Sequence, residues 1–166
     1  MSRSAVRVTT LFVSAKAGAA MQSVDRAEVV AGMGIEGDRY AKGIGVYSKV
    51  EPVKMRHATF ISQQGIDTSN AWLHERQLPP FTPAQTRRNI VLDGIRADEL
   101  NDLVGRTFSV GGVQFRGLEL ATPCHRPSRL LNREGIFEQA FDQRGGLRAE
   151  ACGSGAIQPG DTLLVA

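Results

Sequence analysis

The sequence predicts a single, mainly β domain with short helices, and it favours a closed or half-closed barrel over a parallel sheet. The 166 residues fit one domain far better than two. Eighteen glycines and seven prolines divide the chain at short intervals. The apolar segments between them are mostly too short for helices, and short strands at close spacing are typical of antiparallel barrels.

Short apolar runs predict strands along the whole chain. The strongest hairpin signal is Gly111-Gly112, which separates Thr107–Val110 from Val113–Leu120. The other predicted strands are residues 6–13, Ala27–Val30, Ala58–Ser62, residues 89–92 and residues 162–165. Helical patterns are fewer, and they predict helices at 67–76, 97–103 and 135–143, with Asp67 or Ser69 as the N-cap of the first. Residues 41–56 and 77–87 are predicted to be irregular, and loops of this length are often functional.

The charge of the chain is a weak guide to its partners. The net charge is +3, so the calculated pI near 9.2 depends on only a few surplus charges. Aromatic residues make up 6% of the chain, whereas proteins that bind single-stranded nucleic acids stack bases on aromatic rings, so a nucleic-acid partner is not expected. Most of the 20 basic residues are Arg, which grips planar anions in a fork, although genomic composition alone can also enrich Arg.

Neither a secretion signal nor a membrane-spanning segment is predicted. The N-terminal apolar runs are short and interrupted by charge, and no window approaches the ~18 apolar residues of a membrane span. We therefore expect a cytoplasmic protein that has no membrane partner. Cys124 and Cys152 fit that compartment as free thiols, and their spacing does not match a zinc site.

Two arginine-containing motifs are candidate anion sites. In the first, a glycine-rich turn would project Arg39, with Asp38 orienting it. In the second, Arg87 and Arg88 precede a buried strand with Asn89, and two guanidiniums there suit a phosphate or a carboxylate. The alternatives are a solvated turn with an internal ion pair for the first motif and a charged strand entrance for the second.

The candidate nucleophile is Cys124, in the loop sequence TPCHRP. His125 and Arg126 place positive charge beside the thiol, and such an environment favours a reactive thiolate. A thiolate there could accept sulfur, act as a nucleophile or bind a soft metal. The alternative is a small buried apolar side chain, the commonest fate of a free cysteine.

A further loop, with the sequence RGGLR, places two glycines between arginines. Gly145 and Gly146 would let the backbone approach a ligand closely, with Arg148 returning toward it. A turn at the end of a helix is the alternative interpretation. No chemical partner is visible in the sequence for His57 or His74, so we expect structural roles for both.

The order of these motifs resembles that of the MOSC domain, named after the C-terminal domain of molybdenum cofactor sulfurases. The resemblance covers roughly residues 24–165 and makes this chain similar to a stand-alone, single-domain member. No single motif is decisive, but their ordered combination with a cysteine after a proline is fairly specific. The motifs are GIEGDRY at 34–40, RNIVLDGI at 88–95, ELNDLVGRTFSVGGVQFRG at 99–117, PCHRP at 123–127, RGGLRA at 144–149 and GAIQPGD at 155–161.

The resemblance implies a MOSC-type β-barrel that binds a molybdopterin-type molybdenum cofactor or carries sulfur on a cysteine. Some members of this family reduce N-hydroxylated compounds. Carried over to this chain, Cys124 is the catalytic thiolate that ligates molybdenum or holds a persulfide. The residues implied for a pterin-phosphate pocket are Arg88, Asn89 and Arg148, with Arg39 and Asp38 at its edge and Gly145 and Gly146 in the adjoining loop.

The resemblance also sets expectations about partners. The pyridoxal-phosphate domain of the sulfurases is expected to be absent, so a separate sulfur donor or electron-transfer protein is expected. Recombinant protein is expected to lack the cofactor. Residues 43–56 are longer than the usual link after GDR and could reshape the mouth of the pocket. Two other readings stay open: a non-enzymatic barrel that binds an anionic partner or nucleic acid, and a thiol enzyme with a histidine base.

Overall fold

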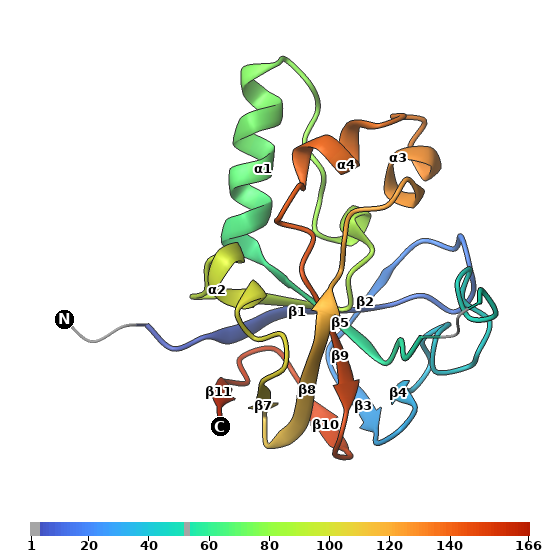
Figure 1. The fold of residues 1–166 in the computed structure, drawn as a ribbon, viewed down its shortest axis with the longest axis vertical. Coiled ribbons are helices and arrows are strands. Elements are labelled where there is room, and N and C mark those ends of the chain that lie inside the picture. Colours follow the sequence, from blue (N-terminus) through green and yellow to red (C-terminus); the bar gives the residue numbers. More distant parts are fainter. Residues whose placement is uncertain (1–3, 52–53) are drawn as a thin grey trace.

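The computed structural model describes residues 4–51 and 54–166, and its main element is one curled sheet of eight strands (Figure 1). All neighbouring strands in this sheet are antiparallel except β5 and β6, which run parallel with Phe60 opposite Ile90. In spatial order the strands are β11 (Leu163–Val165), β7 (Thr107–Val110), β8 (Val113–Leu120), β9 (Leu147–Ala151), β5 (Ala58–Ser62), β6 (Ile90–Asp93), β1 (Arg7–Val13) and β2 (Gln22–Val24).

The two ends of this sheet meet through β1. On one edge of β1, only the C-terminal half pairs with β2. The N-terminal half of the same edge can therefore bond to another segment. There the Val8 amide donates to the Asp161 carbonyl at 2.9 Å, and the Leu163 amide donates to the Val6 carbonyl at 2.8 Å. The sheet therefore forms a barrel-like curl, as expected, and a small second sheet of β3 (Ala27–Val30), β4 (Gly34–Ile35) and β10 (Gly155–Ile157) adjoins it.

The helices gather at one end of the barrel, where α1, α3 and α4 lie above the strands (Figure 1). Helix α1 connects the parallel strands β5 and β6, a crossover that a tight turn cannot make. The helical elements are α1 (Gln63–Glu75), a 3-10 turn at Ala84–Thr86, α2 (Ala97–Asn101), α3 (Arg126–Leu130) and α4 (Ile136–Ala140). None of the helices in the described residues is long and apolar enough to cross a membrane.

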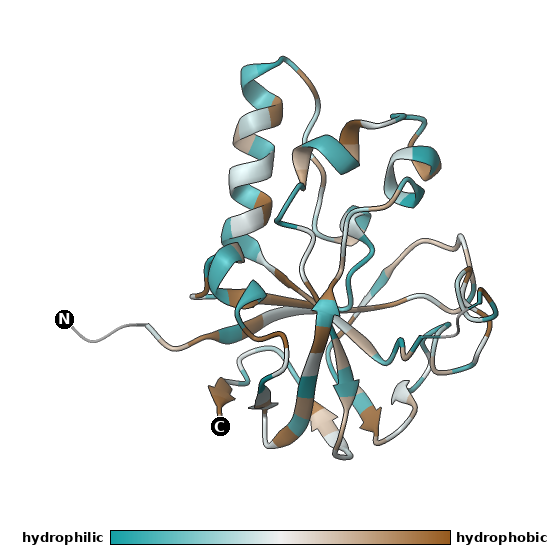
Figure 2. Ribbon diagram, in the orientation of Figure 1, coloured by the Kyte–Doolittle hydropathy of each residue, from teal (hydrophilic) through white to brown (hydrophobic). Residues whose placement is uncertain are grey.

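The fold contains two apolar cores. Inside the barrel, Phe60 meets Phe108 and Phe115 edge-on, with ring centroids 5.3 and 5.2 Å apart. Beneath the helices, Phe81, Phe137 and Phe141 form a second cluster. Apolar and polar residues alternate along β8 (Figure 2), so one face of that strand packs inward and the other meets solvent. The mouth between the two cores is where the chain's polar motifs converge.

Most of the predicted strands are confirmed, four of them with the same bounds. The predicted start of the first helix is wrong: α1 begins at Gln63, because the Ser62 side chain accepts from the Gly65 amide at 3.0 Å and caps it. The other two predicted helices are shorter than expected. Residues 41–51 and 77–87 are irregular apart from the 3-10 turn, and Pro52 and Val53 lie outside the described residues.

Candidate functional site

A cavity of about 230 Å³ opens between the barrel and the helices, and most of the candidate site residues surround it. Its walls come from the β1–β2 connection, the segments around residues 39–47 and 56–59, the entrance to β6, the segment before α3, and β9. The lining residues are Ala17, Gly18, Arg39, Tyr40, Val46, Tyr47, Arg56, Thr59, Arg87, Arg88, Asn89, Ala121, Thr122, Cys124, Arg126, Pro127 and Arg148.

Cys124 faces this cavity from the short segment between β8 and α3. It is a free thiol and is partly exposed. The Tyr47 hydroxyl lies within hydrogen-bonding reach of the Cys124 thiol. Burial first, and then this hydrogen bond, raises the pKa of Tyr47 to about 12. Tyr47 therefore keeps its proton at neutral pH and can donate it in a hydrogen bond to the sulfur.

Six arginines line the cavity, and no carboxylate does among the described residues. Arg88 is buried, and its Nε donates to the Gly145 carbonyl at 2.7 Å while its Nη2 donates to the Ala121 carbonyl at 2.9 Å. These bonds join the segment that carries Cys124 to the start of β9. Burial lowers the pKa of Arg88 to about 10, so it remains charged at neutral pH.

Arg87 reaches the same cavity as Arg88 although the two are consecutive. Side chains of neighbours on an extended strand point to opposite faces, but Arg87 has a left-handed backbone with φ of 63°. Its Nη1 donates to the Ala19 carbonyl at 2.8 Å. Burial, and then repulsion from Arg39 and Arg126, lowers its pKa to about 10. Positive charge is therefore concentrated at this site, and a bound anion would relieve the repulsion between these guanidinium groups.

Two more arginines, Arg56 and Arg148, line the same cavity. Arg148 pairs with Glu119, and its pKa is lowered chiefly by burial and then by the nearby Arg56. The Arg56 guanidinium lies 4.9 Å from the centre of the Tyr47 ring and 5.8 Å from that of Tyr40. Cation–π contacts of this kind orient the guanidinium without neutralising it.

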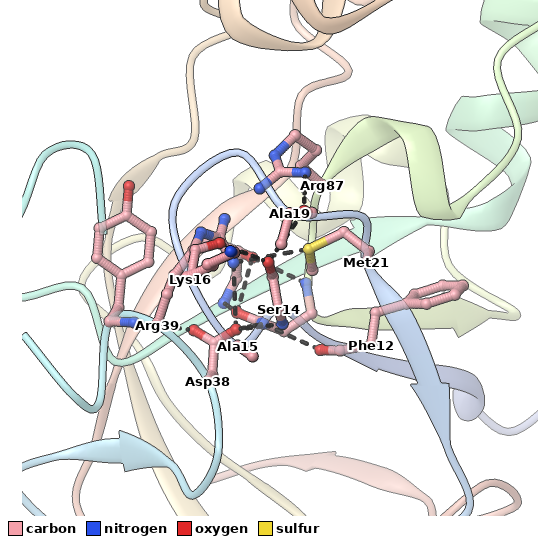
Figure 3. A network of polar contacts seen from close by, with 12 residues as sticks. Phe12, Ser14, Ala15, Lys16, Ala19, Met21, Asp38, Arg39 and Arg87 are labelled. Carbon is pink, nitrogen blue, oxygen red and sulfur yellow. Dashed lines mark hydrogen bonds and ion pairs between the residues drawn. The ribbon is translucent and has the colours of Figure 1, made fainter. Parts of the chain in front are cut away.

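A buried polar network around Asp38 holds Arg39 in place (Figure 3), and further hydrogen bonds fix Asn89. Asp38 is 1% exposed and does not line the cavity. It accepts hydrogen bonds from the Ser14 amide at 3.0 Å and from Arg39 Nη1 at 3.1 Å. Asn89 lines the cavity, but its Oδ1 accepts from the amide and hydroxyl of Thr59, at 3.1 Å each. The structure thus places Asp38 behind Arg39 as its support, while Asn89 links strands at the edge of the cavity.

Gly145 and Gly146 lie next to the site but not in the lining of this cavity. A Cβ on Gly145 would collide with the Ala121 carbonyl, and one on Gly146 with the Phe60 carbonyl. Gly146 also has φ of 98°, which L side chains rarely adopt. These glycines let β9 begin against its neighbours, which positions the carbonyl that Arg88 binds.

The motif search did not single out Arg56, Tyr40 or Tyr47 as site residues, and it treated Arg126 only as a neighbour of Cys124. Arg56 and Tyr47 belong to residues 43–56, the stretch expected to reshape the pocket mouth, and the structure places both in the cavity wall. Tyr40 follows directly after the GDR turn. His57, by contrast, is buried in the barrel, where its Nδ1 accepts from the Ala151 amide at 3.0 Å.

The described residues hold no group of three or more His, Cys, Asp or Glu side chains that could bind a metal ion.

Comparison with known families settles the relationship of the chain: a model of the MOSC domain matches residues 48–164. The chain belongs to the MOSC domain family. MOSC domains are associated with molybdenum cofactor in general. The match leaves out the GIEGDRY motif at 34–40, although Arg39 and Tyr40 line the cavity.

Solved structures show the same MOSC fold at low sequence identity. YuaD from Bacillus subtilis superimposes with a TM-score of 0.79 at 16% identity, covering 99% of this chain and 97% of that chain. YiiM from Geobacillus stearothermophilus gives 0.69 at 14% identity, covering 97% and 75%. YiiM from Escherichia coli gives 0.64 at 17% identity, covering 96% and 69%. No curated protein sequence matches the chain.

Proposed function

We propose that this MOSC protein binds a molybdopterin-type molybdenum cofactor in the arginine-lined cavity and uses it to reduce N-hydroxylated compounds. Cys124 supplies the protein's thiolate ligand to the metal. The observation that carries the proposal is the position of Cys124: a free thiol in a cavity lined by six arginines and, among the described residues, by no carboxylate.

The donor set fits this cofactor. Guanidinium groups bind phosphate in a fork, and Arg88 and Arg126 in the cavity lining can take this role. One thiolate cannot hold a bare metal ion, and the described residues offer no larger group of donors, so a metal here must arrive with other ligands. A pterin dithiolene provides such ligands. Molybdenum in this setting accepts a soft thiolate.

The volume of about 230 Å³ is slightly below the range of ~300–1,000 Å³ that is typical of small-molecule sites. A whole pterin would therefore extend toward the mouth, where Val46 and Tyr47 stand. These residues belong to the irregular stretch that departs from the usual family pattern. We propose that this stretch adapts when the cofactor binds.

Each residue of the chain has a distinct task in this scheme. Arg88 is held by two carbonyls, so it presents a fixed charge to the phosphate. Asp38 accepts a hydrogen bond from Arg39 and so fixes the orientation of its guanidinium group before a ligand binds. Tyr47 keeps a proton at its hydroxyl beside the Cys124 sulfur. When bound, the molybdenum cofactor supplies two-electron oxygen-atom chemistry, and a separate electron-transfer protein would supply the electrons.

The test compares molybdenum and pterin retained after gel filtration by the wild type, Cys124→Ser and Cys152→Ser, each purified anaerobically from a host that makes the cofactor. Cys152 is exposed and lies away from the cavity, so its variant is the matched control. We expect near-stoichiometric metal in the wild type and Cys152→Ser, and at least a fivefold loss in Cys124→Ser. Equal metal in all three contradicts ligation. A persulfide on Cys124 by mass spectrometry, without metal, would replace the proposal with sulfur relay.

A further inference from the structure

A second cavity, of about 310 Å³, adjoins the arginine-lined one and differs from it in character. Its walls are mostly apolar. Met21 directly precedes β2, Ala84 belongs to the 3-10 turn, and Leu130 and Leu131 lie at the end of α3. Arg87 is the only charged residue in its lining among the described residues.

The two cavities share part of their walls. Gly18, Arg87 and Pro127 line both of them. Helix α3, which borders the second cavity, begins at Arg126, two residues after Cys124. Pro127 is its second residue. Arg87 is held at the boundary by its bond to the Ala19 carbonyl. A molecule in the second cavity would therefore have its nearest charged contact at the edge of the site that contains Cys124.

We propose that this second cavity binds the apolar body of the substrate, an organic compound with about two fused rings, whose polar group is directed to Arg87. This inference rests on the proposed function for the identity of the reaction, but the binding it predicts needs no metal. Benzene fills an engineered apolar cavity of ~150 Å³, and the second cavity has roughly twice that volume.

Apolar side chains that line the second cavity are exposed to solvent, which favours a ligand site over a simple gap in the packing. Leu130 is 41% exposed although it faces an apolar hollow, whereas the residues of the neighbouring core are buried. Ala20, which lines the same cavity, is also exposed. A rigid apolar ligand would cover both, and removing apolar surface from water would supply the affinity.

The test is a fluorescence titration of the full-length protein, without metal, using anilinonaphthalene sulfonate, which combines fused rings with an anionic group. We expect Leu130→Asp to weaken binding at least tenfold, because it places a charge in the apolar wall. Ala20→Phe should weaken it similarly by filling the cavity, and it decides the question if Leu130→Asp does not fold. Leu164→Asp is the matched control, because Leu164 is exposed on β11 and lines neither cavity.

The proposal is supported if the first two variants lose affinity for this probe while Leu164→Asp stays within twofold of the wild type. Equal losses in all three variants, or no loss in Ala20→Phe, would overturn it. Sulfate binding and molybdenum retention should be unchanged in Leu130→Asp. Loss of metal in Cys124→Ser therefore reports on the proposed function, and loss of the aromatic probe reports on the second cavity.

Discussion

The side-chain amide of Asn89 donates from Nδ2 to Oδ1 of Asp38 across 3.4 Å, although the two residues belong to motifs far apart in the chain. The same Asp38 oxygen accepts from the Ser14 amide and from Arg39. One buried carboxylate thus connects the GDR turn, the end of β1 and the entrance to β6. The arginines on either side of it reach one cavity because this connection fixes the three segments against one another.

Asp38→Ala should lower the free energy of unfolding by about 3 kcal/mol. The substitution leaves a buried arginine and several donors without their acceptor, and breaking a buried charged pair typically costs about 3–5 kcal/mol. Urea denaturation measures the change. Asp25→Ala is the control, since Asp25 is exposed and should change stability by less than about 0.5 kcal/mol. Similar small effects in both variants would show that the network does not stabilise the fold.

Gly146→Ala should be far more damaging than Gly160→Ala. Both glycines have positive φ, 98° and 95°, so the backbone strain of the substitution is matched. A Cβ at Gly146 collides with the Phe60 carbonyl, whereas nothing lies within 4 Å of one at Gly160. We expect a loss of about 1 kcal/mol for Gly160→Ala and more than twice that for Gly146→Ala, measured by thermal unfolding. Equal losses would mean that β9 can shift away from β5 at little cost.

Anion affinity should be constant from pH 7 to pH 9 and should fall as the pH rises through about 10. Arg87 and Arg88 carry pKa values lowered to about 10, so their charged forms predominate below that pH and are lost above it. Sulfate is a suitable probe because its own charge does not change over this range. Calorimetric titration should show at least a tenfold weaker Kd at pH 11 than at pH 8. A flat profile up to pH 11 would contradict the participation of these two arginines.

Tyr47→Phe should slow alkylation of Cys124 by iodoacetamide about threefold to tenfold at neutral pH. The variant keeps the ring that contacts Arg56 but removes the hydroxyl that can donate to the thiolate. A Cys152→Ser background leaves Cys124 as the only thiol, so mass spectrometry gives the rate directly. An unchanged rate, with the fold intact by circular dichroism, would show that the hydroxyl does not act on the sulfur.

Local patterns predicted much of the barrel. The Gly111-Gly112 hairpin and strands β3 and β5 follow from turn residues and short apolar runs, which act within a few residues. Strand β9 was not predicted, because Gly145 and Gly146, just before it, suggested a loop. Its residues instead alternate between small inward alanines and polar outward ones. Helix α3 was missed because Pro123 and Pro127 suggested a stiff loop, yet Pro127 lies in the first turn of the helix, a position well suited to proline.

The candidate site was predicted in part for a similar reason. Arg39, Arg88, Asn89, Cys124 and Arg148 lie in recognisable motifs, and the structure brings all five to one cavity. Arg56 and Tyr47 lie in an irregular stretch, where only the tertiary fold decides which side chains turn inward. The sequence predicted that Asp38 orients Arg39, and the structure shows that contact. The motif gave no sign that Asp38 also bonds to Ser14 and Asn89, because these residues come from distant segments.

The most direct test of the central claim is X-ray absorption at the molybdenum edge, measured per metal atom on the molybdenum that the wild type, Cys124→Ser and the Cys152→Ser control each retain. If the Cys124 thiolate binds the metal, the sulfur contribution around molybdenum falls in Cys124→Ser and stays unchanged in Cys152→Ser. Full metal occupancy in Cys124→Ser with an unchanged sulfur environment would contradict the assignment of this cysteine as the metal ligand.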